Sequence, residues 1–167
     1  MRLICMALAT AVMIPADAGA QGGLAPPPPL VGQAEQLFLT HCLPNADDPS
    51  RALDGLLGSG AFETHQTAAD GTTTLHGAND QLVAQVVQGG AGHDRCAVRA
   101  GNIPGAKLKT GQSAARLATG LNLSLGREAP SLHYPAGAQI MHMGAHSIRV
   151  GQPAGTADVV EISLTKS

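Results

Sequence analysis

Seven histidines are the chemically distinctive residues of this 167-residue chain. Neutral imidazole is the commonest metal ligand in proteins, so the spacing of the histidines is the first pattern to test. Two pairs have a spacing that could bring two rings together: His65 with His76, and His142 with His146. A zinc site needs three or four protein ligands, and each pair supplies only two. The sequence therefore offers zinc or copper binding as an alternative, with no cofactor as the first expectation.

The pair His65 and His76 flanks the dipeptide Asp70-Gly71, which favours a tight hairpin turn. If these two residues form the whole loop, His65 lies directly opposite His76, with Cβ atoms about 4.5 to 5.5 Å apart. Two imidazoles at that separation can approach one metal ion. The neighbouring side chains on that face are threonines, however, and an exposed polar face explains the same pattern.

His142 and His146 are four positions apart. On a helix this spacing puts both imidazoles on one face, as in zinc-binding helices. The segment lacks the glutamate that serves as a general base in such helices, and it contains Gly144. On a strand the two side chains point the same way but lie about 13 Å apart, too far to share one metal ion. A Cu(I) site that uses the thioether of Met141 or Met143 is a variant of this alternative.

The first twenty residues are typical of a cleaved export signal. Arg2 follows Met1, residues 3–15 form an apolar run, and Ala18-Gly19-Ala20 is a small-residue cleavage site. The run is shorter than the roughly 20 apolar residues that cross a bilayer, although an uncleaved N-terminal anchor is the alternative interpretation. We therefore expect a signal peptide at residues 1–20, a periplasmic or secreted protein, and no membrane span after cleavage.

Two cysteines, Cys42 and Cys96, remain once residues 1–20 are removed. An even pair in an oxidising compartment predicts one disulfide, whereas a redox-active or metal-binding thiol pair usually has a Cys-x-x-Cys spacing that this chain lacks. The bridge would close a loop of about 55 residues, worth at most about 4 kcal/mol by the chain-entropy estimate. His93 and Asp94 precede Cys96, but successive strand residues diverge, and a disulfide would remove the nucleophile that thiol catalysis needs.

Composition argues against several classes of partner. The chain is 44% hydrophobic, so it can form a core, but it contains two Phe, one Tyr and no Trp. It therefore lacks the aromatic platforms on which most single-strand binders stack nucleic-acid bases. A formal net charge of -2 provides no basic surface for nucleic acid or an anionic membrane.

Proline, glycine and hydrophobic periodicity divide the rest of the chain into a spacer and one domain. Residues 21–32 contain four consecutive prolines and predict an extended, flexible spacer, followed by a single domain at residues 33–167. Helices are expected at residues 33–43, 48–58 and 110–121, with Gly111 and Gly120 marking the edges of the last one. The second helix has Asp48 as its cap. The sequence shows no internal repeat.

Seven strands are expected from period-two patterns and turn dipeptides. They are placed at residues 62–68, 72–76, 81–88, 95–100, 139–143, 146–150 and 158–165. In the fourth strand, Cys96 and Val98 share one face, and Ala97 and Arg99 share the other. The fold class expected is α+β: an antiparallel meander packed against two or three helices, with one disulfide joining the first helix to the sheet.

An export signal, a helix with Phe38-x-x-x-Cys42, a meander and a strand with Cys96-Ala97-Val98 follow one another along the chain. This plan resembles small uncharacterised exported proteins of Gram-negative bacteria. The resemblance implies a periplasmic address and carries no catalytic residue with it.

Motifs for catalysis are sparse. The chain has no Gly-x-Ser-x-Gly, no phosphate-binding Gly-Lys-Ser/Thr and no dinucleotide-binding glycine pattern, and its carboxylates lie mostly at caps and turns. The sequence leaves enzymatic activity undecided and favours a non-enzymatic role. We expect an exported domain that binds a protein or a cell-envelope component. The alternative is a periplasmic metal-binding protein that uses His65, His76, His142 and His146.

Overall fold

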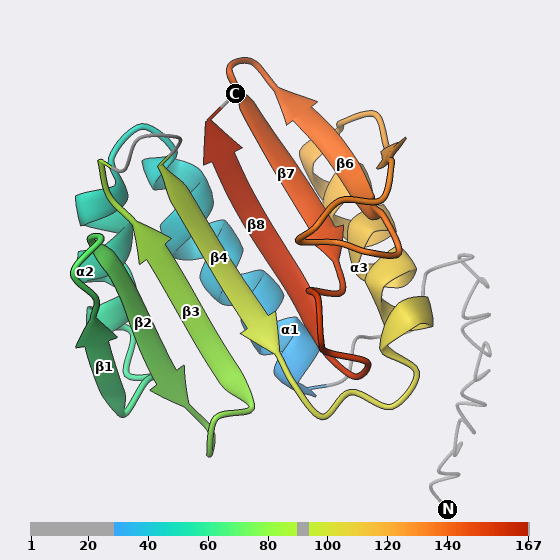
Figure 1. The fold of residues 1–167 in the computed structure, drawn as a ribbon. Coiled ribbons are helices and arrows are strands. Elements are labelled where there is room, and N and C mark those ends of the chain that lie inside the picture. The colour runs from blue at the N-terminus through green and yellow to red at the C-terminus, as the bar shows by residue number, and fades with distance from the viewer. Residues whose placement is uncertain (1–28, 90–93, 167) are drawn as a thin grey trace, which may run out of the picture.

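The computed structural model describes residues 29–89 and 94–166, which form a layer of helices packed on one face of an eight-stranded antiparallel sheet (Figure 1). This arrangement confirms the α+β class and the helix-covered antiparallel sheet. The expected signal peptide and residues 21–28 of the expected spacer lie outside the described residues. Within the described ranges, no helix is both long and apolar enough to cross a membrane.

Helix α1 (Pro29–Leu37) begins four residues ahead of the predicted start at Gln33. It continues through a π-helical turn, Phe38–Cys42, and a 3₁₀ turn, Leu43–Asn45. A proline fits the first turn of a helix because its missing N–H would have no partner there. Val31 is fully buried. The last four residues of the predicted spacer therefore belong to the helix, and Val31 to the core.

Helix α2 (Pro49–Gly58) confirms the predicted cap, because Asp48 Oδ1 accepts a hydrogen bond from a backbone N–H three residues later at 3.2 Å. Its buried face is formed by Ala52 and Leu56. Leu57, the next residue along the helix, is 41% exposed. Successive helix residues are about 100° apart, so Leu57 falls outside the narrow stripe that meets the sheet.

Helix α3 (Ala106–Leu121) is longer than predicted, and the two glycines expected at its edges both lie inside it. The helix is flanked by Gly105 and Asn122, which both adopt left-handed conformations, with φ of 69° and 53°. Left-handed residues at the ends allow the chain to turn away from the helix axis. Gly111 and Gly120 have open space where a Cβ would be, and a helix tolerates each at about 1 kcal/mol relative to alanine.

The eight strands form two meanders that meet at β4 and β8. The first meander is β1 (Thr64–Thr67), β2 (Thr72–Gly77), β3 (Leu82–Val87) and β4 (Arg95–Ala100). The second is β5 (Gly126–Glu128), β6 (Ala138–Met143), β7 (His146–Gly151) and β8 (Val160–Lys166). The order across the sheet is β1-β2-β3-β4-β8-β7-β6-β5. The sheet thus consists of two four-stranded meanders, although the sequence shows no repeat. The short strand β5 was not predicted.

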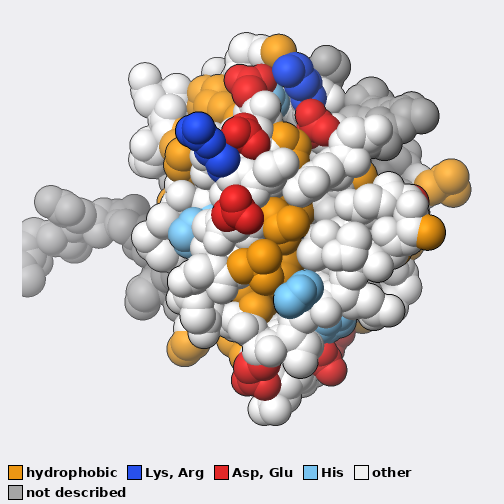
Figure 2. Space-filling view, turned by 90° about the vertical axis from the view of Figure 1, so that its left-hand side faces the viewer, with side chains coloured by type: hydrophobic (Ala, Val, Ile, Leu, Met, Phe, Trp, Pro, Cys, Tyr) orange, Lys and Arg blue, Asp and Glu red, His pale blue; other side chains and the backbone are white. Residues whose placement is uncertain are grey.

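The core lies between the helices and the face of the sheet that they cover. The strands contribute aliphatic side chains that are fully buried, among them Leu75, Val86, Val98, Ile148 and Ile162. From the helical layer, Phe38 is fully buried against them. Hydrophobic side chains also reach the surface on the side of the molecule formed by α2 and β1 (Figure 2). There the exposed Leu57 accompanies the half-buried Leu53 and Phe62.

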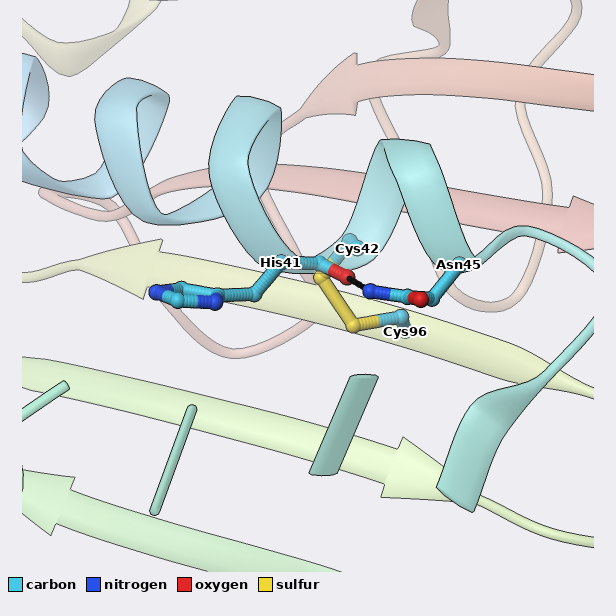
Figure 3. Close-up of a disulfide and its surroundings, with 4 residues drawn as sticks. All are labelled: His41, Cys42, Asn45 and Cys96. Atoms are coloured by element: carbon cyan, nitrogen blue, oxygen red, sulfur yellow. Dashed lines mark hydrogen bonds between the residues drawn. A yellow bond between two sulfur atoms is a disulfide. The ribbon is translucent and has the colours of Figure 1, made fainter. Parts of the chain in front are cut away.

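The predicted disulfide is present and joins the end of the helical segment that begins with α1 to β4 (Figure 3). Cys42 and Cys96 have Cα atoms 5.6 Å apart, and both side chains lie on the core side of the sheet. Asn45 Nδ2 donates a hydrogen bond to the carbonyl oxygen of His41 at 2.8 Å, which helps to terminate the helical segment beside the bridge. The disulfide therefore ties the helical layer to a central strand.

Candidate functional site

The hairpin between β1 and β2 does not bring His65 and His76 together. Its loop consists of residues 69–71, closed by a backbone hydrogen bond of 2.8 Å between the residues that flank it. Gly71 has a φ of +83°, as in three-residue loops that end in a left-handed residue, whereas a two-residue loop was predicted. The register therefore pairs His65 with Leu75. This shift by one residue puts the two imidazoles on opposite faces of the sheet.

The hairpin between β6 and β7 separates the second pair in the same way. The register pairs His146 with Met143 and His142 with Ser147, so the two imidazoles lie on opposite faces. His142 is exposed, whereas His146 is buried on the helix side. Met141 is fully buried in the core. Neither histidine pair is assembled into a shared site.

Within residues 29–89 and 94–166, no three His, Cys, Asp or Glu side chains are grouped so that they could hold a metal ion. His93 lies outside the described residues. Cys96 is bonded to Cys42, so its sulfur is not a free thiolate for nucleophilic catalysis.

A charged cluster centred on Glu161 of β8 lies on the outer face of the sheet, opposite the helices. The Glu161 side chain is completely buried. Arg95 Nη2 donates a hydrogen bond to Oε1 of Glu161 at 2.5 Å, and Arg99 Nε donates one to Oε2. The Tyr134 hydroxyl donates to Oε1 at 2.5 Å, and His133 Nε2 lies 2.8 Å from the same oxygen. Two guanidinium groups thus compensate a carboxylate that water does not reach.

Alternation along the central strands places these charges. Arg95 and Arg99 lie on the outer face because Cys96 and Val98 face the core, as the sequence pattern predicted for the fourth strand. The register sets Arg99 directly opposite Glu161 on the neighbouring strand β8. Side chains in this position touch across a sheet, which allows a direct ion pair.

The charges around Glu161 hold it in its ionised form. Burial by itself raises the pKa of a carboxyl group, but the two guanidinium groups, with hydrogen bonds from Tyr134 and His133, lower the pKa of Glu161 to about 2. Burial and the negative charge of Glu161 together raise the pKa of Tyr134 well above its usual value of 10. At neutral pH, Glu161 is therefore an anion that accepts hydrogen bonds, and Tyr134 is a neutral donor.

Residues 129–137, between β5 and β6, form a strap that crosses the outer face in front of β7 (Figure 1). Tyr134 anchors it: its ring packs so closely on Gly151 that a Cβ there would lie 2.5 Å from the ring. The Tyr134 hydroxyl is also 2.9 Å from Ser163 Oγ. The backbone N–H of Tyr134 donates a hydrogen bond to Ser131 Oγ at 3.1 Å. Glycine at position 151 is therefore the residue that leaves room for the strap.

The strap and the sheet border a cavity of about 250 Å³, which we name the outer cleft. Its walls are the side chains of Arg95, Glu128, Ser131, His133, Tyr134, Arg149, Ser163 and Thr165. Arg149 Nε donates to Glu128 Oε2 at 2.8 Å, and its Nη1 donates to Thr165 Oγ1 at 2.5 Å. The His133 side chain is 41% exposed at the rim. Every residue that lines the cleft thus carries a polar group, and each of its two arginines already has a carboxylate partner.

Glu161 and Tyr134 are both poorly suited to acid–base or nucleophilic chemistry at neutral pH. A general base works best with a pKa near the working pH, whereas Glu161 holds its proton only in strong acid. Tyr134 does not lose its proton near neutral pH, so it is not an activated nucleophile. What remains is a set of hydroxyl, imidazole and guanidinium groups held in place by their own partners. Such groups can orient a ligand through hydrogen bonds.

The sequence patterns did not predict this site. The signal available was the placement of Arg95 and Arg99 on one face of a central strand, with Glu161 in the middle of the most β-branched strand. A charge at the centre of a buried strand normally needs a partner, which points to a cluster without naming its members. The strap residues carry no pattern that links them to β8.

Comparison with known proteins found no matching family model, no matching curated protein and no matching solved structure. The outer cleft therefore has to be interpreted from its own side chains.

Proposed function

We propose that this protein is an exported, non-enzymatic binding domain whose outer cleft takes an uncharged, hydroxyl-rich fragment of the cell envelope, such as a sugar ring. The observation that carries the proposal is the cleft itself: all eight residues that line it carry polar groups, and Arg95, Arg149 and Glu128 are already held in ion pairs.

Charge pairing is what favours an uncharged ligand. Arg95 contributes to neutralising Glu161, and Arg149 neutralises Glu128, so an incoming anion would have to compete with a carboxylate already in place. A sugar hydroxyl can donate and accept hydrogen bonds without displacing these pairs. Ser131 and Thr165 offer hydroxyl groups of the same kind on two walls of the cleft. The cavity volume suits one or two sugar rings rather than a large ligand.

Export is part of the proposal. The pattern of residues 1–20 supports a cleaved signal, and the Cys42–Cys96 disulfide supports an oxidising compartment such as the periplasm or the exterior. A cell envelope contains polysaccharides, whose sugar rings carry many uncharged hydroxyl groups.

The test is a titration of the purified, oxidised protein with a panel of neutral mono- and disaccharides, followed by NMR chemical shifts. We expect saturable shifts at the strap and β8. Thr165→Val removes one hydroxyl from the cleft wall and should weaken binding by roughly tenfold at most, the effect of one hydrogen bond. Thr74→Val makes the same change on the outer face of β2, away from the cleft, and should leave binding unchanged.

Two outcomes would contradict the proposal. Equal effects of the two valine variants, or no saturable shift with any sugar, would remove the outer cleft as the binding site. Release of a cleavage product from a bound disaccharide would show that the protein is an enzyme.

A further inference from the structure

A second cavity of about 150 Å³, which we name the end cavity, lies on the helix side of the sheet, between the start of α3 and strands β5 and β6. Lys107 and Gly111 line it from α3, and Arg127 and Gln139 line it from the paired strands β5 and β6. It shares no lining residue with the outer cleft. The two cavities can therefore be changed independently.

Unpaired positive charge distinguishes the end cavity. Nine of the ten Lys and Arg residues fall within the described ranges, because only Arg2 lies outside them. Six of the nine form an ion pair with a carboxylate. Among the described residues, Lys107, Lys109 and Arg127 have no carboxylate partner, and two of these three line the end cavity. None of the residues that line it is acidic.

Placing two cations around one small cavity has an electrostatic cost that an anion would relieve. A guanidinium group offers a planar fork of donors that matches the oxygens of a phosphate, and an ammonium group adds a point charge. Gln139 brings a neutral amide to the same wall. Two positive charges match one dianion better than they match a single carboxylate.

Gly111 leaves room for such a ligand. It lies inside α3, where alanine would be more favourable to the helix, and a Cβ at this position would have open space around it beyond the neighbouring backbone of its own helix. The wall of the cavity is therefore bare backbone at this point. A larger side chain here would enter the cavity without a clash in the helix itself.

We propose that the end cavity binds a phosphate group, carried either by inorganic phosphate or by a phosphate monoester. Lys107 and Arg127 supply the two charges, and Gly111 supplies the space. The cavity is too small to enclose a nucleotide, so any larger part of a monoester extends past the exposed side chains of Lys107 and Arg127.

Isothermal titration with inorganic phosphate and with glycerol phosphate, at constant ionic strength, tests this proposal. We expect saturable binding that weakens as salt is added. Lys107→Gln and Arg127→Gln should each weaken it about tenfold or more. Lys109→Gln is the matched control: it removes the third unpaired charge from the same helix, outside the cavity, and should change affinity less than twofold.

Gly111→Leu tests the space directly. This variant should abolish phosphate binding while its circular dichroism and melting curve show an intact fold. Tighter binding of glycerol phosphate would identify a monoester as the ligand, and tighter binding of inorganic phosphate would identify the free ion. The proposal is overturned if neither compound binds saturably, if Lys109→Gln weakens binding as much as Lys107→Gln, or if a folded Gly111→Leu protein still binds.

Discussion

The two halves of the sheet have the same strand order but different outer faces. In the β5–β8 half, the strap covers the sheet, Tyr134 is buried beneath it, and Glu161 is removed from solvent. In the β1–β4 half, all four side chains of β1 are exposed, and Thr74 and Gln85 lie half-buried on the outer face. On the inner face, α1 and α2 cover the β1–β4 half, and the Cys42–Cys96 disulfide links the helical segment that follows α1 to β4. Helix α3 covers the β5–β8 half.

This difference shows where buried charge is permitted. A carboxylate can be withdrawn from water only where other groups replace its hydration, and the strap brings two of the four that do so. Where no strap covers the sheet, the outer faces of β2 and β3 carry half-buried threonine, histidine, glutamine and valine side chains and no buried carboxylate among the described residues. The shared topology is therefore a scaffold, and the loop between β5 and β6 creates the cleft.

Glu161→Gln is expected to have the largest effect on the free energy of unfolding. The amide keeps the shape of the carboxylate but leaves Arg95 and Arg99 facing a neutral partner. Removing one member of a buried ion pair costs about 3 to 5 kcal/mol. We expect a loss of this size in the free energy of unfolding, measured by urea denaturation.

Glu63→Gln provides the control for that variant. It makes the same change at an exposed position just before β1, in the half without a strap. It should alter the free energy of unfolding by less than about 0.5 kcal/mol. Similar losses for both variants would show that the covered half does not depend on its buried charge.

Loss of the disulfide is expected to have the next largest effect on the free energy of unfolding. It should destabilise the β1–β4 half before the β5–β8 half. The bridge joins residues 54 positions apart, so Cys42→Ala combined with Cys96→Ala should lower the free energy of unfolding by at most about 4 kcal/mol. Hydrogen exchange should accelerate more in β3 and β4 than in β6 and β7. Equal acceleration in both halves would mean that the bridge stabilises the sheet as one cooperative unit.

Acid should weaken the covered half through Glu161. The pKa of Glu161 falls from a usual value of 4.5 to about 2 on folding. Its contribution to the free energy of unfolding is therefore fully present above about pH 4.5 and is lost as the pH falls toward 2. The contribution is about 3 kcal/mol. Between pH 7 and pH 3, urea denaturation of the wild type should show a loss of about 2 kcal/mol of this contribution, because Glu161 is still partly ionised at pH 3. The Glu161→Gln variant should lack this loss. An identical acid dependence in that variant would contradict the assignment.

Local patterns were enough to predict much of the scaffold. Asp48 before Pro49 marked the start of α2, alternation placed Cys96 and Arg99 on opposite faces of β4, and the cysteine pair indicated the bridge. The cap and the strand alternation depend on residues only a few positions apart. The disulfide follows because residues 21–167 contain only two cysteines, which can pair in only one way. The left-handed Gly71 was harder to foresee, because two-residue and three-residue loops both accept Asp-Gly.

The sequence by itself determined the α+β class, most of the strands and the disulfide, because hydrophobic period, turn residues and cysteine count are local properties. Only the tertiary structure decided which polar residues meet. Arg95 and Glu161 are 66 positions apart, and Tyr134 reaches Glu161 from a strap without regular structure. A histidine pair, by contrast, was separated by a shift of one residue in a hairpin. Contacts of this kind depend on strand order and register, which follow from packing of the whole chain.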